Sequence, residues 1–304
     1  MLTKRLNFAP TAVTIDLHSG DDPNDIAAAA DLLASRGVAA TFFVPTAMLK
    51  DSMVRAALIS IPLYGHEVGT HGHDHDWNEM DSLGRGRGKE IAFLRQSKNA
   101  FEDFFGVAPT CFRSPCWCVL GEGALDELEA LGYLVDSSST PQRLSVFSSR
   151  PYSASWTFAS RKPYWIRKHL LEIPMTSLGV PAGSPTFSTL RRCISSIFIK
   201  LALIESLLSQ ETIVNVQFHV SDLCPNMHRK RVRERIRPTD FALRRRGGFS
   251  FKYHLRQTDE AEIWKTSHAL LSLLEGQARL TLSGIRTRFM EYPSDSKQPS
   301  IALE

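Results

Sequence analysis

A short strand-like run leads directly into a dense group of histidines in Gly65-His66-Glu67-Val68-Gly69-Thr70-His71-Gly72-His73-Asp74-His75-Asp76-Trp77. If the chain enters a helical turn after the strand, His71 and His75 lie on one side of it, because they are four residues apart. Their imidazoles could then bind one cation, while His73 points elsewhere. A solvated polar loop is the alternative, since a single His-x-x-x-His pair recurs by chance.

Strand-like and helix-like segments alternate along the chain. This order is typical of βα units around a parallel sheet or barrel. Asp21 or Asp22 is expected to cap the first helix, and Gly37 to end it. The expected strands are residues 12–16, 39–44, 66–70, 109–113, 133–136, 171–175, 212–218 and 280–282, and the expected helices are residues 23–36, 89–105, 124–131, 189–208 and 260–274.

The composition favours a single domain over residues 1–304, since 43% of the side chains are hydrophobic and can form one large core. No internal repeat or Pro/Gly-rich linker divides the sequence. Residues 137–170 lack periodicity and are predicted to form an irregular loop. Residues from about 222 to 258 are predicted to form a basic insertion.

The sequence also indicates a cytoplasmic location. The chain has five cysteines, an odd number, and Cys116 and Cys118 are too close for an easy bridge, so a secreted disulfide framework is not expected. The first residues lack the apolar stretch of a signal peptide. No apolar run reaches the roughly 18 residues of a membrane-spanning helix.

Polar residues cluster where the expected strands end. A barrel of parallel strands builds its active site at that edge. The clusters are Thr14-Ile15-Asp16-Leu17-His18, His71 with His75, Phe112-Arg113-Ser114-Pro115-Cys116-Trp117, Val135-Asp136 and Gln217-Phe218-His219.

With the strand Ala40-Thr41-Phe42-Phe43-Val44, these ordered clusters resemble the motifs of the polysaccharide deacetylase family, carbohydrate esterase family 4, from about residue 11 to 219. The resemblance implies an α/β fold, a distorted (β/α) barrel of parallel strands. It also implies a metal-dependent hydrolase that removes an acetyl or formyl group from an N-acylated sugar. In that reaction Asp16 would be the general base, Arg113 would hold Asp16, His219 would be the general acid and Asp136 would orient His219.

The chemistry agrees with these roles. Amide hydrolysis needs an activated water, a stabilised oxyanion and a proton for the departing amine. An arginine beside Asp16 favours the ionised form that a base requires. Each residue also has a structural alternative: Asp16 could cap a helix, Arg113 could form a surface ion pair, His219 could be a buried structural histidine and Asp136 could cap a turn.

The first cluster departs from the family pattern. The family usually has two adjacent aspartates, of which the second binds the metal, and here Leu17 occupies that second position. One branch of the family places its two acids one residue apart, and on that register His18 takes the ligand position. Two strand residues separated by one point to the same side, so Asp16 and His18 can share a pocket.

His18, His71 and His75 would then form a three-imidazole set, which suits Zn²⁺ with an open position for water. We therefore expect a divalent metal cofactor, with zinc as the best match. The alternatives are that His18 is an exposed loop residue, that Asp21 or Asp22 supplies a carboxylate ligand in its place, or that no metal binds.

Trp117 is a candidate for substrate binding, because an indole can stack on a sugar ring or contact an acyl methyl group. A core aromatic is the equal alternative. The flanking Cys116 and Cys118 are interpreted as small apolar side chains and not as thiolate ligands.

Nine basic residues against two acidic ones give the stretch from Arg229 to Arg246 a local charge of +7, in a chain whose total is +4. Such a cluster favours an anionic phosphate group or an anionic membrane surface, unless it is simply a solvated insertion. Nucleic acid is the weakest candidate, since neither a helix-turn-helix nor interleaved aromatics accompany the charge. A phosphate- or lipid-linked sugar precursor in the cytoplasm fits this pattern.

Two other functions remain open at the sequence level. A cyclic amide or ureide hydrolase of the same fold, with or without a metal, is suggested by Leu17. A non-catalytic carbohydrate-binding protein is the second alternative. The joint presence of Asp16, Arg113, Asp136 and His219 argues against it.

Overall fold

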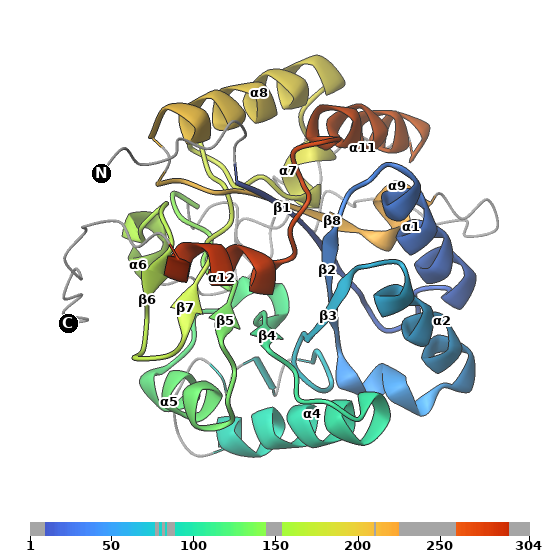
Figure 1. Ribbon diagram of the computed structural model, residues 1–304, viewed down its shortest axis with the longest axis vertical. Helices are drawn as coiled ribbons and strands as arrows, with labels where there is room; N and C mark the ends of the chain where they lie inside the picture. The colour runs from blue at the N-terminus through green and yellow to red at the C-terminus, as the bar shows by residue number, and fades with distance from the viewer. Residues whose placement is uncertain are drawn as a thin grey trace, which may run out of the picture.

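The computed structural model describes residues 10–76, 79–80, 83, 89–143, 154–209, 211–224 and 260–291. In this part of the chain eight strands form one sheet, in the order β6-β7-β5-β4-β3-β2-β1-β8, which curls into an incomplete barrel (Figure 1). Neighbouring strands are parallel except β6, which is antiparallel to β7. The strands are β1 (Thr11–Asp16), β2 (Ala40–Val44), β3 (Glu67–Thr70), β4 (Cys111–Phe112), β5 (Val135–Asp136), β6 (Tyr164–Trp165), β7 (Leu171–Glu172) and β8 (Val214–His219).

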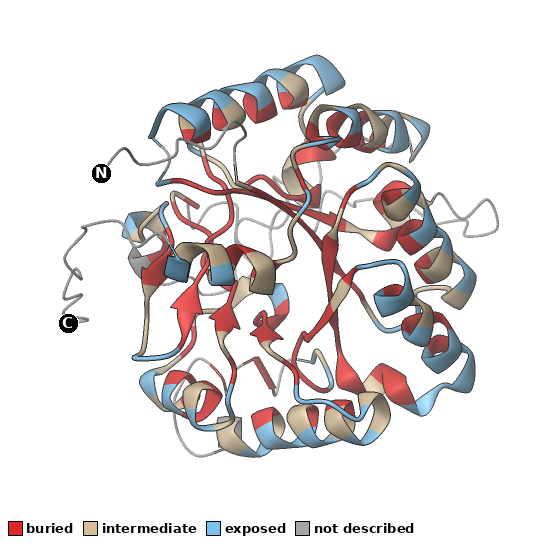
Figure 2. Ribbon diagram, in the orientation of Figure 1, coloured by how far each residue is buried: buried red, intermediate tan, exposed pale blue. Residues whose placement is uncertain are grey.

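Helices surround the sheet and turn their buried faces toward it (Figures 1 and 2). This is the distorted (β/α) barrel predicted from the sequence, with the antiparallel β6 as an addition. The helices are α1 (Pro23–Ser35), η1 (Thr46–Lys50), α2 (Ser52–Leu63), α4 (Lys89–Phe105), η2 (Pro115–Trp117), α5 (Glu122–Ala130), α6 (Ala154–Phe158), α7 (Ser184–Phe187), α8 (Arg192–Ser209), α9 (Val220–Leu223), α11 (Glu260–Leu274) and α12 (Leu282–Glu291).

The alternation of side chains along β1 determines which residues can reach the barrel interior. Val13, Ile15 and Leu17 are fully buried in the core that also contains the apolar face of α1. Thr14 and Asp16 point to the opposite side, because neighbouring strand residues face opposite ways. Leu17 therefore packs between sheet and helices and is not positioned to bind a metal.

The prediction of an irregular loop over residues 137–170 is wrong for part of that segment. Residues 137–140 are buried directly after β5, and the segment also contains α6 and β6. Tyr164 pairs with Glu172, and Trp165 with Leu171, so β6 extends the sheet by one strand. Strands of two residues are too short to produce a detectable period in the sequence.

The predicted final strand at residues 280–282 is also wrong, because α12 begins there. The Thr281 hydroxyl accepts a hydrogen bond from the Gly284 N–H at 3.3 Å. The Glu67 carboxylate accepts one from the Ser283 N–H at 3.2 Å. Both contacts satisfy N–H groups in the first turn, and the negative charge of Glu67 also favours the positive end of the helix dipole.

The same carboxylate joins α12 to the amino ends of three strands. Glu67, at the start of β3, accepts hydrogen bonds from the hydroxyls of Thr41 on β2 at 2.8 Å and Thr110 before β4 at 3.0 Å. It also accepts a contact from the Cys111 thiol at 3.2 Å. Glu67 thus holds this helix against the amino end of the barrel, opposite the edge where the polar clusters lie.

A buried contact between two acidic residues lies between β5 and β7. Asp136 and Glu172 are direct register partners, and both are fully buried. Asp136 Oδ2 and Glu172 Oε2 have no hydrogen-bond partner among the described residues, and two adjacent buried carboxyl groups favour a state in which they share one proton. Burial raises the pKa of both groups, to about 6 for Asp136 and well above its usual value for Glu172.

Replacing Glu67 by Ala should destabilise the protein, because it leaves donors from two strands and one helix without their shared acceptor. The expected loss is about 2 kcal/mol or more in the free energy of unfolding. Urea denaturation measures it. The matched control is Glu262→Ala, which removes only an exposed pair with Lys265 and should change stability by less than about 0.5 kcal/mol. Equal small losses in both variants would contradict this role for Glu67.

The carboxyl pair predicts a specific pH dependence of stability. The folded-state pKa of Asp136 is raised to about 6, so the unfolded chain releases this proton at lower pH than the folded protein does. The free energy of unfolding is therefore highest at low pH and falls as pH rises toward that value. Asp136→Asn cannot ionise. Between pH 5 and pH 7.5 the variant should therefore lose less stability than the wild type, by on the order of 2 kcal/mol. Urea denaturation at both pH values tests this, with the exposed Asp126→Asn as control. Parallel curves for wild type and Asp136→Asn would exclude the shared proton.

Candidate active site

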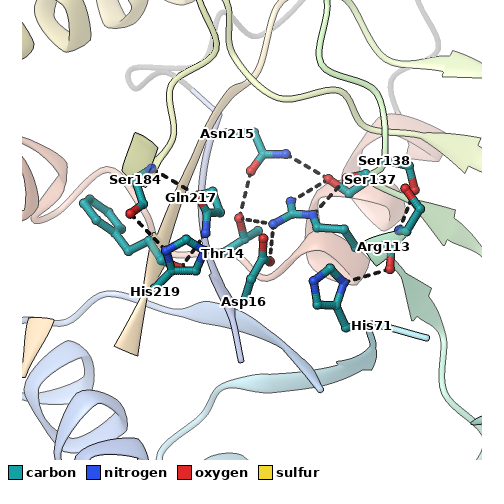
Figure 3. Close-up of polar contacts among 12 residues, drawn as sticks. Thr14, Asp16, His71, Arg113, Ser137, Ser138, Ser184, Asn215, Gln217 and His219 are labelled. Atoms are coloured by element: carbon teal, nitrogen blue, oxygen red, sulfur yellow. Dashed lines mark hydrogen bonds and ion pairs between the residues drawn. The ribbon is translucent and has the colours of Figure 1, made fainter. Parts of the chain in front are cut away.

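Side chains at or just after the carboxyl ends of β1, β3, β4, β5 and β8 converge at this edge of the barrel (Figure 3). The central contact is an ion pair in which Asp16 Oδ1 accepts a hydrogen bond from Arg113 Nη1 at 2.7 Å. Asp16 is 3% exposed and Arg113 is fully buried, so the alternative of a surface ion pair is wrong. Asp16 does not cap α1 either, because Asp22 does so by accepting from the Asn24 N–H.

Every nitrogen of the Arg113 guanidinium has a fixed partner. Nε donates to the Ser137 carbonyl and Nη2 to the Ser137 hydroxyl, both at 2.9 Å. Nη1 donates to the Thr14 hydroxyl at 2.9 Å as well as to Asp16. The Phe43 ring lies 4.4 Å from the guanidinium carbon on one side. The positive charge is thus held rigidly against the Asp16 carboxylate.

Three imidazoles gather beside this ion pair. The ring centre of His75 lies 4.8 Å from that of His71 and 4.9 Å from that of His18, and the remaining pair is 6.3 Å apart. His71 Nδ1 donates to the Arg113 carbonyl at 2.9 Å, which fixes its tautomer and leaves Nε2 with a lone pair. Burial and the neighbouring histidines lower the pKa of His71 well below its usual value, so its ring is neutral. The structure therefore brings together the histidines that the sequence proposed as ligands.

The prediction that His71 and His75 lie on one helical turn is wrong. Residues 71–76 form a loop, and the backbone is left-handed at Gly72, with φ of 74°, and at His75, with φ of 56°. The rings meet because the loop folds back and not because of helical spacing.

Glu79, a residue that no motif in the sequence marks, sets the shape of that loop. Its fully buried carboxylate accepts hydrogen bonds from the N–H groups of His73 at 2.6 Å and His75 at 2.7 Å. Burial raises the pKa of Glu79 to about 7. A side chain at Gly72 would place its Cβ 2.6 Å from Glu79 Oε1, so only glycine fits there.

The other candidates for the cluster lie elsewhere. His73 hydrogen-bonds to Thr46 at 2.8 Å and to Gln96 at 2.7 Å, and so points away as predicted. Asp21 accepts a hydrogen bond from the His18 N–H at 2.8 Å, which gives this acid a role in shaping the loop. Across the described ranges no group of three His, Cys, Asp or Glu side chains is already arranged to hold a metal ion. The histidine cluster is thus a set of donors that is close together but is not a finished coordination sphere.

His219 ends β8 directly opposite Asp16 on β1, and its ring centre lies 4.7 Å from that of His18. The prediction that Asp136 orients it is wrong, because the Asp136 carboxyl contacts Ser138 and Glu172. His219 Nδ1 instead forms a 2.9 Å hydrogen bond with the Ser184 hydroxyl.

Asp222 is the second polar group beside His219. Its carboxylate accepts from the His219 N–H at 2.7 Å and lies 3.7 Å from Nδ1. Ser184 from α7 and Asp222 from α9 therefore make the contacts with His219 that the sequence predicted for Asp136.

Trp117 lies in the turn after β4. The turn is left-handed at both Cys116 and Trp117, with φ of 53° and 52°. The ring is half-buried, with the Arg143 guanidinium 5.5 Å from its centre, and the Trp117 carbonyl accepts from Trp156 Nε1 at 3.1 Å. Because the Trp117 ring is partly accessible, it can contact a substrate. Its role in stacking on a sugar ring stays a prediction. Cys116 is exposed, Cys118 is half-buried, and all five cysteines are free thiols.

The sequence did contain a signal for further residues of this site. Asn215, Gln217 and His219 alternate with apolar residues along β8, which predicts a polar face toward the barrel interior. The structure places Asn215 on that face, where its amide donates to the Ser137 hydroxyl at 3.0 Å and so supports the Arg113 network (Figure 3). Gln217 accepts there from the Ser184 N–H at 3.1 Å.

The stretch from Arg229 to Arg246 lies outside the described residues, as does most of the predicted basic insertion. Within the described ranges, no helix has both the length and the apolar character needed to span a membrane.

A model of the polysaccharide deacetylase family matches residues 7–135. No curated protein sequence matches the chain significantly. Among solved structures, a Mycobacterium smegmatis protein provisionally named a polysaccharide deacetylase is similar over 97% of this chain and 96% of its own, with 13% identity and a TM-score of 0.57. A GH57-type branching enzyme from the archaeon Pyrococcus horikoshii is similar over 95% of this chain and 71% of its own, with 13% identity and a TM-score of 0.52.

At such low identity these structures establish a shared fold and not a shared reaction. The family match is more specific, because it spans the strand ends that carry Asp16, the histidine loop and Arg113. By this match over residues 7–135, the first part of the chain is similar to the polysaccharide deacetylase family.

Proposed function

We propose that the protein is a metal-dependent hydrolase that removes an N-acyl group, acetyl or formyl, from a sugar. The match of residues 7–135 to the polysaccharide deacetylase family supports sugar deacetylation, which is hydrolysis of a carbon–nitrogen bond outside peptides. The observation that carries the proposal is the convergence of three imidazoles beside a buried Asp–Arg pair and a fourth histidine.

The donor set suits a divalent metal of the zinc type. Three neutral imidazoles with an open position for water are a common catalytic zinc set. His71 has the outer contact typical of such ligands, since its Nδ1 donates to a backbone carbonyl and leaves Nε2 available. His18, His71 and His75 would hold the ion, after small rotations of their side chains. When bound, the metal would lower the pKa of a water and polarise the acyl carbonyl.

The chain's own residues supply the proton transfers. Asp16 has one oxygen bound to Arg113, so its other oxygen can take the proton from the attacking water. His219 can protonate the departing amine, which leaves poorly as an anion. Asp16 and His219 are register partners on adjacent strands, about one strand spacing apart, and this proximity supports their assignment as base and acid.

The substrate class is a second part of the proposal. Trp117 is half-buried beside the site and can stack on a sugar ring. The basic stretch from Arg229 to Arg246 favours a phosphate- or lipid-linked precursor, and the lack of a disulfide framework favours a cytoplasmic one.

No feature of the described residues favours the cyclic ureide hydrolase. That alternative depended on Leu17, which is explained by its packing in the apolar core. The fold alone does not decide between reactions, because a branching enzyme shares it.

The metal site predicts that His71→Ala and His75→Ala each lose stoichiometric zinc, since two remaining protein ligands bind far more weakly than three. His18→Asp should keep zinc and part of the activity, because a carboxylate is an acceptable ligand, whereas His18→Leu should lose both. Elemental analysis of the folded variants measures this. His73→Ala is the matched control, since its ring points away from the cluster. Full zinc content in His71→Ala and His75→Ala would remove these residues from the site.

The roles of Asp16 and His219 predict different responses to the leaving group. Asp16→Asn should lower kcat by roughly 10²- to 10⁴-fold on every substrate. His219→Ala should have a similar effect on an N-acetyl sugar and a much smaller one on an aryl acetate, whose phenolate departs without a proton. Equal fractional loss on both substrates would show that His219 is not the acid.

The same assay distinguishes which residue orients His219. Ser184→Ala should lower kcat on the N-acetyl sugar by about 3- to 30-fold with little change on the aryl acetate, since it removes one hydrogen bond to the ring. Asp136→Asn serves as the comparison and should leave this substrate preference unchanged. The reverse pattern would support Asp136 as the orienting residue.

A further inference from the structure

Helix α8 has apolar residues on both of its faces. Its inner face, which includes Phe198, Ile199 and Ala202, is buried against the body of the protein. Its outer face is exposed along the whole edge of the molecule (Figure 2). The large apolar side chains on that face are 43–81% exposed, and they are Ile194, Ile197, Leu201, Ile204, Leu207 and Leu208.

Five of these residues form one continuous line, because they recur at intervals of three and four along the helix. We call this line the α8 stripe, and it consists of Ile194, Ile197, Leu201, Ile204 and Leu208. Single exposed apolar residues are common on soluble proteins, but a contiguous row of this length marks a contact surface.

The exposed charges of α8 and of the residue before it are all positive. Arg191, Arg192 and Lys200 are exposed at the start and on the flank of the helix. The acid of the helix, Glu205, is bound to Arg161 at 2.5 Å. An apolar line flanked by cations is the pattern of a helix that lies in the interface of an anionic membrane, where long basic side chains extend toward the phosphates.

A second copy of the chain would fit this surface less well. A twofold pairing of α8 with itself brings the same three cations from both copies to one interface, and α8 supplies no exposed acid to balance them. A bilayer that contains anionic lipid supplies both the apolar phase and the negative charge.

We infer that α8 is a peripheral membrane-binding element. The α8 stripe enters the boundary between headgroups and acyl chains of an anionic bilayer, while Arg191, Arg192 and Lys200 contact lipid phosphates. This inference does not depend on the catalytic proposal. It concerns the outer edge of the molecule, and a deacetylase, a different hydrolase or a binding protein could each use it.

The test is co-sedimentation of the full chain with vesicles of phosphatidylcholine alone and of phosphatidylcholine with 30% phosphatidylglycerol. The wild type should bind the anionic vesicles at least 10-fold more tightly than the neutral ones. Leu201→Gln with Ile204→Gln should lower binding to the anionic vesicles at least 10-fold. The matched control is Ile59→Gln with Leu63→Gln, which removes two comparably exposed residues from α2 and should leave binding unchanged.

Three results would overturn the inference. The first is absence of binding to anionic vesicles by the wild type. The second is undiminished binding by the stripe variant, which would assign the interaction to another basic region such as Arg229 to Arg246. The third is a wild-type dimer, measured by sedimentation, that the stripe substitutions convert to a monomer without any effect on vesicle binding, because a second copy would then cover the α8 stripe. Circular dichroism confirms that each variant is folded.

Discussion

The buried ion pair between Asp16 and Arg113 organises the polar interior of the barrel. Removing two charges from water costs several kcal/mol for each ion, unless other polar groups complete their hydrogen bonds. The barrel interior supplies these groups from Thr14 and Ser137, and Asn215 in turn holds Ser137. For this reason the inside of the barrel is polar at its carboxyl end, and the main apolar core lies between the sheet and the surrounding helices.

The same arginine connects the two halves of the site. Its side chain holds Asp16, and its backbone carbonyl accepts the Nδ1 proton of His71. A shift of the β4 end would therefore move the proposed base and one proposed metal ligand together. The loop with the other ligand, His75, is held separately by the buried Glu79. Base, acid and ligands thus come from different strand ends, and the barrel fixes their relative positions.

The sequence predicted the parts of this arrangement that depend on local pattern. The bounds of α4 and α11, the carboxyl ends of β1, β2, β3 and β5, and the grouping of Asp16, Arg113, His71, His75 and His18 all follow from periodicity or motif order. The parts it did not predict depend on contacts between distant segments. The start of α12 depends on Glu67, and the orientation of His219 depends in part on Ser184, which is 35 residues away and which no local spacing connects to it. The left-handed backbone at His75 depends on the hydrogen bond that the Glu79 carboxylate accepts from the His75 N–H. No pattern in the sequence around His75 predicts that conformation.

The central claim is that His18, His71 and His75 hold one metal ion beside Asp16. The most direct test is a crystal structure of the zinc-loaded protein, with anomalous diffraction recorded on both sides of the zinc absorption edge. We predict one zinc peak in contact with His71 Nε2 and with a ring nitrogen from each of His18 and His75. It would be contradicted by a fully active crystal without a zinc peak in the barrel, or by a peak coordinated by Asp21 or Asp22 in place of His18.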